Sequence, residues 1–118
     1  MKTLVIGASE KEERYSNQAI KRLLEAQHEV KAIGLRKGNV NGVDFDTEKI
    51  AYKDIHTVTL YVGVKRQDEY YDYIESLKPK RVIFNPGTEN KEWQERLEEK
   101  GIEALEACTL VLLRTNQF

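Results

Sequence analysis

Two short glycine-bearing segments carry the residue types that could hold an anionic ligand. Gly7-Ala8-Ser9 follows the apolar run Leu4-Val5-Ile6, and Asn85-Pro86-Gly87 follows Arg81-Val82-Ile83-Phe84. Each precedes a sequence typical of a helix, and Ser16 lies where the first of these helices should begin. Glycine allows close approach of a backbone to a ligand, and the free N–H groups at a helix start favour a negative charge. We therefore interpret both segments as walls of a phosphate site, although they lack the G-x-G-x-x-G dinucleotide fingerprint.

A pair of cations follows the second predicted strand. The sequence there is Ile33-Gly34-Leu35-Arg36-Lys37, without the Asp or Glu that an NAD site usually places at this point for the ribose hydroxyls. Arg36 can bind a phosphate through two parallel hydrogen bonds, and Lys37 adds a point charge. The pair suits a phosphorylated ribose, as in NADP or the 3′-phosphate of coenzyme A (CoA). Roles without a ligand stay open for these residues. Arg36 and Lys37 can be solvated surface charges, Gly7 can simply turn the chain, and Ser16 can simply cap a helix.

Candidate catalytic side chains are few in this sequence. His28 and His56 precede the second and third predicted strands, so we expect both at the edge of the sheet opposite the ligand. Cys108 lies in an apolar run, which is typical of a small buried residue, and it is the single cysteine. No Ser-His-Asp, Cys-His or metal-ligand spacing occurs. We therefore name no catalytic residue and no metal, and leave open whether the chain is an enzyme.

Alternating strands and helices must position these residues. Apolar runs predict buried strands over residues 2–6, 30–33, 57–62, 81–84 and 102–104. Helical spacing of apolar residues predicts amphipathic helices from Ser16, over 67–77 and over 89–100, the last capped by Thr88. We interpret residues 34–50 as an irregular loop, helical only around 48–52, and the tail over 108–113 as a helix.

The βαβ spacing of these elements predicts an α/β, Rossmann-like three-layer fold. We expect a parallel five-stranded sheet in the order 3-2-1-4-5, with helices on both faces. In that order the ligand crevice lies between strands 1 and 4, next to both glycine-bearing segments. The length of 118 residues, without a linker or a repeat, predicts one domain over 1–118.

Composition excludes several partner classes. The 19 Lys and Arg residues balance 20 Asp and Glu residues, giving a formal net charge of -1, whereas nucleic-acid binders usually have a basic excess. No apolar stretch approaches the ~20 residues of a membrane helix, and the opening run is too short for a secretory leader. We therefore expect a cytoplasmic protein with a small-molecule nucleotide ligand, bound to neither nucleic acid nor membrane. The apolar tail over 110–113 leaves a homodimer or a partner enzyme open.

The order of these motifs resembles that of the small stand-alone CoA-binding domain proteins, which are related to the N-terminal domain of the succinyl-CoA synthetase alpha subunit. The resemblance begins with Val5-Ile6-Gly7-Ala8-Ser9 and continues through Arg14-Tyr15-Ser16-Asn17. It returns from Gly87 to Ile102 and ends at Cys108. This resemblance implies a Rossmann-like domain that binds CoA or an acyl-CoA, with the diphosphate against the first loop and helix.

Positions carried over from that family complete the expected site. The resemblance implies that the diphosphate contacts Gly7, Ala8, Ser9 and Ser16, with Arg14 nearby. It implies that two further loops line the other walls through Val62, Gly63, Val64, Asn85, Pro86 and Gly87. The chain has Val64-Lys65 where many relatives have Phe-Arg, and Pro86 where they have Gln. We expect a small non-catalytic CoA-binding or acyl-CoA-binding protein, while an NADP-binding reductase component and an interaction domain without a ligand remain alternatives.

Overall fold

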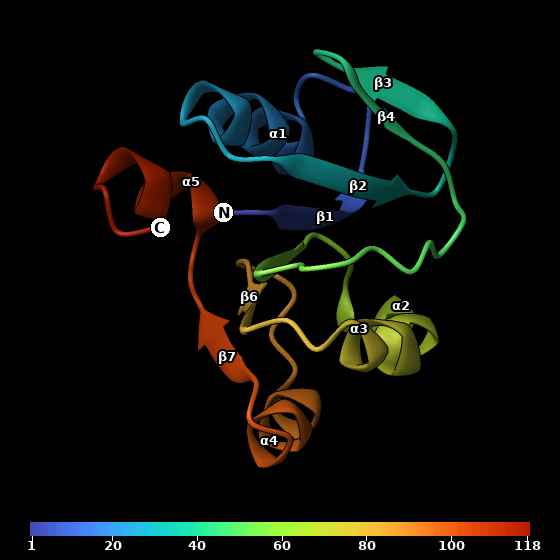
Figure 1. Cartoon of the computed structure of the whole chain (residues 1–118), viewed down its shortest axis with the longest axis vertical. Helices are drawn as coiled ribbons and strands as arrows, with labels where there is room; N and C mark the ends of the chain where they lie inside the picture. The colour runs from blue at the N-terminus through green and yellow to red at the C-terminus, as the bar shows by residue number, and fades with distance from the viewer.

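The predicted strands form one parallel sheet, which the computed structural model, covering residues 1–118, places between two layers of helices (Figure 1). Its order is β2-β1-β5-β6-β7, and every neighbouring pair is parallel. The α/β three-layer fold expected from the sequence is confirmed. The strand bounds are Thr3–Ala8 for β1, Val30–Gly34 for β2, Thr57–Leu60 for β5, Arg81–Phe84 for β6 and Glu103–Glu106 for β7.

The helices follow the predicted pattern with two differences. Their bounds are Tyr15–Glu25 for α1, Val64–Gln67 for α2, Tyr71–Leu77 for α3, Lys91–Glu99 for α4 and Thr109–Arg114 for α5. The single helix predicted over 67–77 is interrupted by a 3₁₀ turn, η1 (Asp68–Tyr70). The cap of α4 is Asn90 and not Thr88: Asn90 accepts from the Trp93 N–H at 3.1 Å, whereas the Thr88 hydroxyl donates to the Asn85 carbonyl. No helix is long and apolar enough to cross a membrane.

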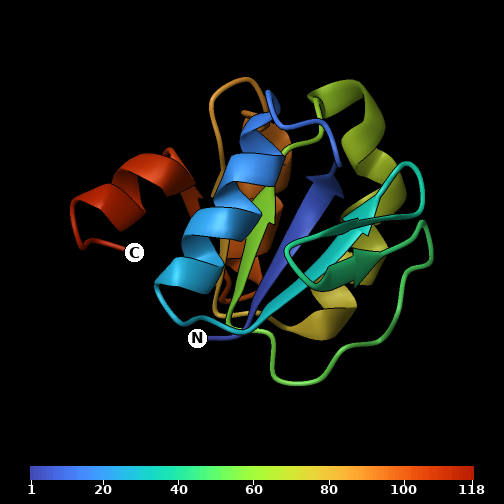
Figure 2. The same cartoon turned by 90° about the horizontal axis from the view of Figure 1, so that it is seen from above.

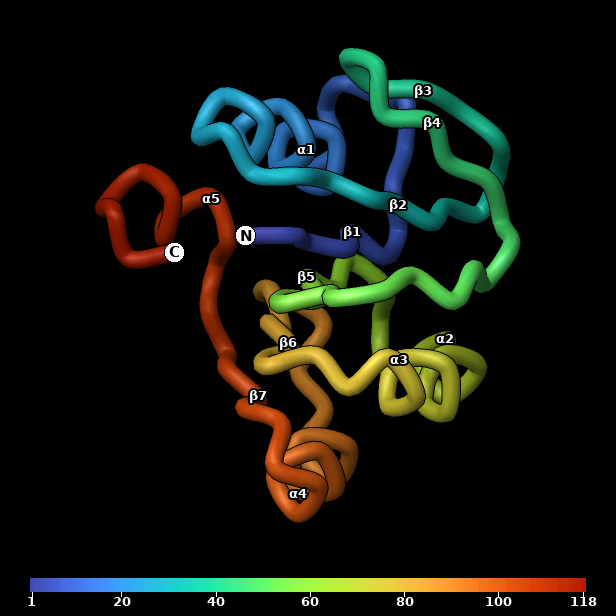
Figure 3. The backbone as a smooth tube through the Cα atoms, viewed as in Figure 1, coloured from blue at the N-terminus to red at the C-terminus, as the bar shows by residue number.

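Alternation along the strands gives the sheet two apolar faces. Leu4 and Ile6 of β1 pack in the larger core, against α3 and α4, while Val5 faces the opposite way toward α1. Figure 3 shows α1 and α5 on one side of the sheet and α2, α3 and α4 on the other. Trp93 of α4 is the largest fully buried side chain of the larger core, the one that contains Leu4 and Ile6. Both faces of the sheet are therefore covered, as a parallel sheet requires.

A hairpin occupies the middle of the loop predicted over 34–50. Strands β3 (Gly38–Val40) and β4 (Val43–Phe45) pair antiparallel, joined by Asn41-Gly42 with φ values of +48° and +91°. Asn-Gly is the pair that such a two-residue turn favours, because both positions need a positive φ. Val40, Val43 and Phe45 are buried in the core on the α1 side of the sheet. Residues 48–52 form no helix, contrary to the sequence interpretation.

The hairpin also explains why the predicted strand order 3-2-1-4-5 is wrong. The strand over 57–60, expected at the edge beyond β2, pairs instead with β1, in register from Thr3 with Thr57 to Ile6 with Leu60. The place beyond β2 is taken by the hairpin, and Asp46 forms a parallel bridge to Ile33 (Figure 2). The chain leaves β1 toward β2 and leaves β5 toward β6. The ligand crevice of the fold therefore lies between β1 and β5.

Candidate functional site

A cavity of about 620 Å³ lies along the edge where β1, β2, β5 and β6 end. Its lining combines the loops that follow these four strands. Most residues predicted from the sequence line it: Gly7, Ala8, Ser9, Arg14, Ser16, Arg36, Lys37, Val62, Gly63, Pro86 and Gly87. The sequence reasoning thus found four loops that meet at one cavity, even though the strand order it used was wrong.

Three predicted residues do not line the cavity. The Asn85 amide is buried and fully used: it donates to Thr59 Oγ1 at 2.7 Å and to the Leu60 carbonyl at 2.8 Å, and its oxygen accepts from the Thr109 N–H at 2.9 Å. Gly34 is buried where β1 and β2 approach, and a Cβ there would lie 2.6 Å from the Ala8 carbonyl oxygen. Val64 is an exposed residue at the start of α2. Asn85 and Gly34 therefore lie beneath the cavity, where they hold the strand ends that carry its lining loops.

The start of α1 presents free hydrogen-bond donors to the cavity. The first two N–H groups of the helix, on Tyr15 and Ser16, have no acceptor within the chain. Ser16 is only 3% exposed, lines the cavity, and its hydroxyl has no hydrogen-bond partner. Asn17 donates to the Ser9 carbonyl at 3.0 Å and so holds the preceding loop against the helix. This arrangement suits an anion at the helix start.

Gly7 brings the first loop against the end of β5. Its φ of +97° lies in the region that favours glycine, and the register between β1 and β2 shifts at this residue. The Tyr61 N–H donates to the Ile6 carbonyl at 2.8 Å. A Cβ on Gly7 would lie 2.9 Å from the Tyr61 carbonyl oxygen, which is too close for any side chain. The floor of the cavity between β1 and β5 therefore depends on a glycine at this position.

The cavity is strongly cationic, although the whole chain is nearly neutral. Five cationic side chains line it: Lys11, Arg14, Arg36, Lys37 and Arg66. None of the five lies in an ion pair, whereas other Lys and Arg residues of the chain do. The single acidic lining residue, Glu10, accepts a hydrogen bond from the Asn39 N–H at 2.9 Å. Unpaired cations gathered around one cavity favour an anionic ligand.

Sequence reasoning missed several lining residues. They are Glu10, Lys11, Tyr15, Leu35, Phe45, Tyr61, Arg66 and Thr88. Leu35 is 51% exposed, whereas the Phe45 ring is buried beneath Gly34 and Gly38. Burial raises the pKa of Tyr61 to about 12. In the sequence, Leu35 stands directly before Arg36 and Lys37. An apolar residue beside two cations in a loop was the signal that could have indicated its place in the cavity.

The histidines lie away from the cavity, as their positions in the sequence predict. His56 precedes β5 at the opposite edge of the sheet, where its Nδ1 lies 2.8 Å from Thr57 Oγ1. His28 precedes β2, and its Nδ1 lies 2.9 Å from the Met1 amine. Burial, followed in size by nearby positive charge, lowers the pKa of both histidines. Cys108 is half-buried at the start of α5 and does not line the cavity.

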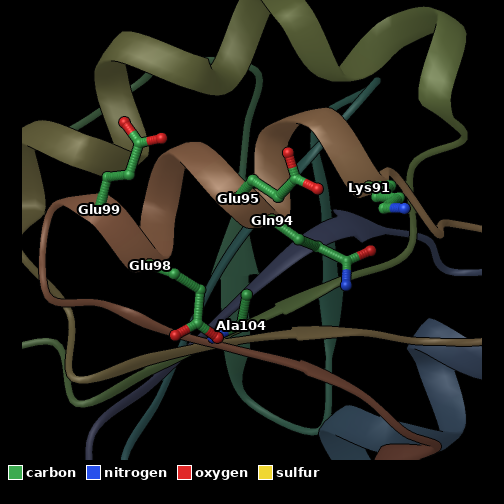
Figure 4. Close-up of a pocket in the computed structure, with 6 residues that line it drawn as sticks. All are labelled: Lys91, Gln94, Glu95, Glu98, Glu99 and Ala104. Atoms are coloured by element: carbon green, nitrogen blue, oxygen red, sulfur yellow. The ribbon is translucent and has the colours of Figure 1, made fainter.

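A second, acidic groove of about 490 Å³ lies between α4 and β7 (Figure 4). Its lining includes Glu95, Glu98 and Glu99 of α4 and Ala104 of β7. Glu98 accepts a hydrogen bond from the Ala104 N–H at 3.3 Å. Because β7 is an edge strand, this contact covers one of its outward amides. The groove is thus explained by protection of the sheet edge, and its charge disfavours an anionic ligand.

No cluster of His, Cys, Asp and Glu side chains suits a metal ion.

Comparison with known proteins links the chain to one family. The sequence profile of a family described as "CoA binding domain" matches residues 1–114. A crystal structure of an uncharacterized protein is 47% identical, with a TM-score of 0.97, over 99% of this chain and 97% of that chain. A conserved hypothetical protein from Pyrococcus furiosus is 25% identical, with a TM-score of 0.81, over 93% of this chain and 97% of that chain.

A larger enzyme contains a similar fold. The dinucleotide forming acetyl-coenzyme A synthetase 1 of Ca. Korarchaeum cryptofilum is 17% identical, with a TM-score of 0.72, over 89% of this chain and 25% of that chain. At this identity the likeness concerns the fold alone. No curated protein matches the chain.

Proposed function

This chain belongs to the CoA binding domain family, and from that premise we propose that its cationic cavity binds CoA or an acyl-CoA. In this proposal the protein holds the ligand as a carrier, sensor or adaptor and does not transform it. Both histidines lie at the edge of the sheet opposite the cavity, which supports a binding role over acid–base catalysis.

The observation that carries the proposal is the match of charge between cavity and ligand. CoA has a diphosphate and a separate 3′-phosphate, which together bear close to four negative charges at neutral pH. The cavity offers five cationic side chains and one acidic side chain, within a chain whose formal net charge is -1. Concentrated positive charge at this one place supports a ligand with several phosphates.

The order of the loops supports one orientation of the ligand. The diphosphate would lie at the start of α1, against the Ser16 hydroxyl, with Arg14 close by. Arg36 and Lys37, after β2, would hold the 3′-phosphate. The pantetheine arm would extend the other way, toward the loops after β5 and β6. Strands spaced about 4.8 Å apart put about 14 Å between β2 and β6, which suits a long ligand.

Calorimetric titration with CoA, dephospho-CoA, NADP and NAD, at one fixed salt concentration, tests the proposal. We expect CoA to bind tightest, dephospho-CoA about tenfold more weakly for the lost ion pairs, and NAD not at all. The Ser16→Ala variant should weaken CoA binding, because its unpartnered hydroxyl faces the proposed diphosphate. His56→Ala is the control and should bind like the wild type.

The other ligands decide between the alternatives. Tighter binding of NADP than of CoA would favour a nucleotide-binding reductase component, since Arg36 and Lys37 also suit a 2′-phosphate. No binding of any of the four would favour an interaction domain without a ligand. Either result would contradict the proposal.

A further inference from the structure

A fully buried amide joins two walls of the cavity. Gln67, the last residue of α2, has no exposed surface. Its Nε2 donates to the Val62 carbonyl at 2.8 Å and to the Thr88 carbonyl at 2.7 Å. Val62 follows β5, Thr88 follows β6, and both line the cavity. One side chain therefore links two loops that lie on different strands and 26 residues apart in sequence, as their numbers 62 and 88 show.

The orientation of this amide is fixed by its partners. Two carbonyl oxygens can only accept, so the NH₂ group of Gln67 must face them. Its Oε1 accepts from Asn90 Nδ2 at 2.9 Å, and the same Nδ2 donates to the Tyr71 hydroxyl at 2.8 Å. The Asn90 oxygen in turn accepts from the Trp93 N–H. Each member of this network is held by the next, from the cavity wall to the start of α4.

An apolar residue would fill the space of Gln67 at less desolvation cost than a buried amide. The amide instead supplies the hydrogen bonds that two buried carbonyls next to a binding cavity require. Without it, the loops at Val62 and Thr88 would lose their common donor, and the spacing between them would be free to change.

We propose that Gln67 is a positioning residue that sets the distance between the Val62 and Thr88 loops and so selects for the pantetheine arm of the ligand. This inference rests on the proposed function, because it assumes the orientation in which the arm extends toward β5 and β6. Gln67 itself does not line the cavity. In that orientation the proposed phosphate contacts at Ser16, Arg36 and Lys37 lie on α1 and after β2, away from the network.

Two ligands separate positioning from general stability. CoA uses the whole cavity, whereas adenosine 3′,5′-bisphosphate lacks the pantetheine arm. Gln67→Met keeps the size of the side chain and removes both donors. We expect this variant to bind CoA about tenfold more weakly, since a small displacement of binding loops has large effects. Its affinity for the bisphosphate should stay within about twofold of the wild type, because distant sites act independently.

The control is Gln117→Met, which makes the same chemical change on an exposed side chain near the C-terminus. Should Gln67→Met not fold, Tyr71→Phe tests the same network more mildly, because it removes only one of the two acceptors of Asn90 Nδ2 and leaves the bond to Gln67. We then expect CoA alone to bind more weakly. Equal losses for both ligands, or no loss, would overturn the positioning role. If the wild type binds neither ligand, the proposed function is wrong and this inference falls with it.

Discussion

At the scale of single residues, Arg36 should distinguish CoA from its form without the 3′-phosphate. Its guanidinium is exposed, lines the cavity and lies in no ion pair. We expect Arg36→Ala to weaken CoA binding by at least about tenfold, because a charge-assisted hydrogen bond contributes about 1.5–3 kcal/mol. Dephospho-CoA should bind the variant and the wild type equally. Calorimetric titration measures both, and Arg114→Ala, at an exposed cation of α5, is the control. Equal losses for both ligands would contradict the assignment of Arg36 to the 3′-phosphate.

Tyr61 should link the stability of the protein to alkaline pH. Burial raises the pKa of its phenol to about 12, and its hydroxyl has no hydrogen-bond partner. Between about pH 10 and 12 the unfolded chain has lost this proton while the folded protein keeps it, so the free energy of unfolding falls as the pH rises. Tyr61→Phe has no phenol to titrate and therefore removes this loss of stability between about pH 10 and 12.

Urea unfolding at pH 7, 9 and 11.5 measures the effect. At pH 7 we expect Tyr61→Phe to be about 1 kcal/mol more stable than the wild type, because the variant buries no unpartnered hydroxyl. From pH 9 to 11.5 the wild type should lose more stability than the variant. Other tyrosines with raised pKa values, such as Tyr73, are present in both proteins, so the comparison isolates Tyr61. Parallel losses in the two proteins would refute the prediction.

At the scale of elements, the sequence predicted those parts of the fold whose residues carry a single clear period. Leu4-Val5-Ile6 is apolar on both faces, and α1 buries Ile20 and Leu23 on one side, so local pattern and final packing agree. The β3–β4 hairpin escapes prediction because residues 34–50 are rich in Gly, Asn and Asp, a composition typical of a loop. Asn41-Gly42 between Val40 and Val43 was the signal that could have predicted it.

The missed hairpin also limited the prediction of the site. Phe45 reaches the cavity only because β4 packs beside β2, and Arg66 and Thr88 do so because β5 lies next to β1 and β6. These contacts depend on pairing between strands that are distant in the sequence. The spacing of apolar residues within one element does not predict such pairing. Loops that end strands, such as Gly7-Ala8-Ser9, could be predicted because all parallel strands end at one edge. Asn85 was assigned to the ligand because a loop sequence does not show which way a side chain points.

At the scale of the whole molecule, the two ends of the sheet differ in how they are closed. The hairpin covers the β2 side, whereas β7 is an open edge with exposed Glu103 and Glu106 and the Glu98 contact to Ala104. Negative charge along this edge disfavours pairing of two copies through it. The apolar α5 packs beside α1 but leaves Val111 41% exposed. A homodimer or a partner enzyme at α5 stays a prediction.

The distribution of charge over the molecule predicts a strong effect of salt on ligand binding. The formal net charge is -1, so attraction of an anionic ligand must come from the local field of the five cavity cations. The Debye length falls from about 10 Å at 0.1 M salt to about 3 Å at 1 M, which screens this field. We expect the Kd for CoA to rise on the order of tenfold between 0.05 and 0.5 M NaCl, measured by calorimetry. The Arg36→Ala variant should show a shallower dependence, since one of the screened charges is missing. A Kd independent of salt would mean that the cations do not contact the phosphates and that apolar contacts hold the ligand.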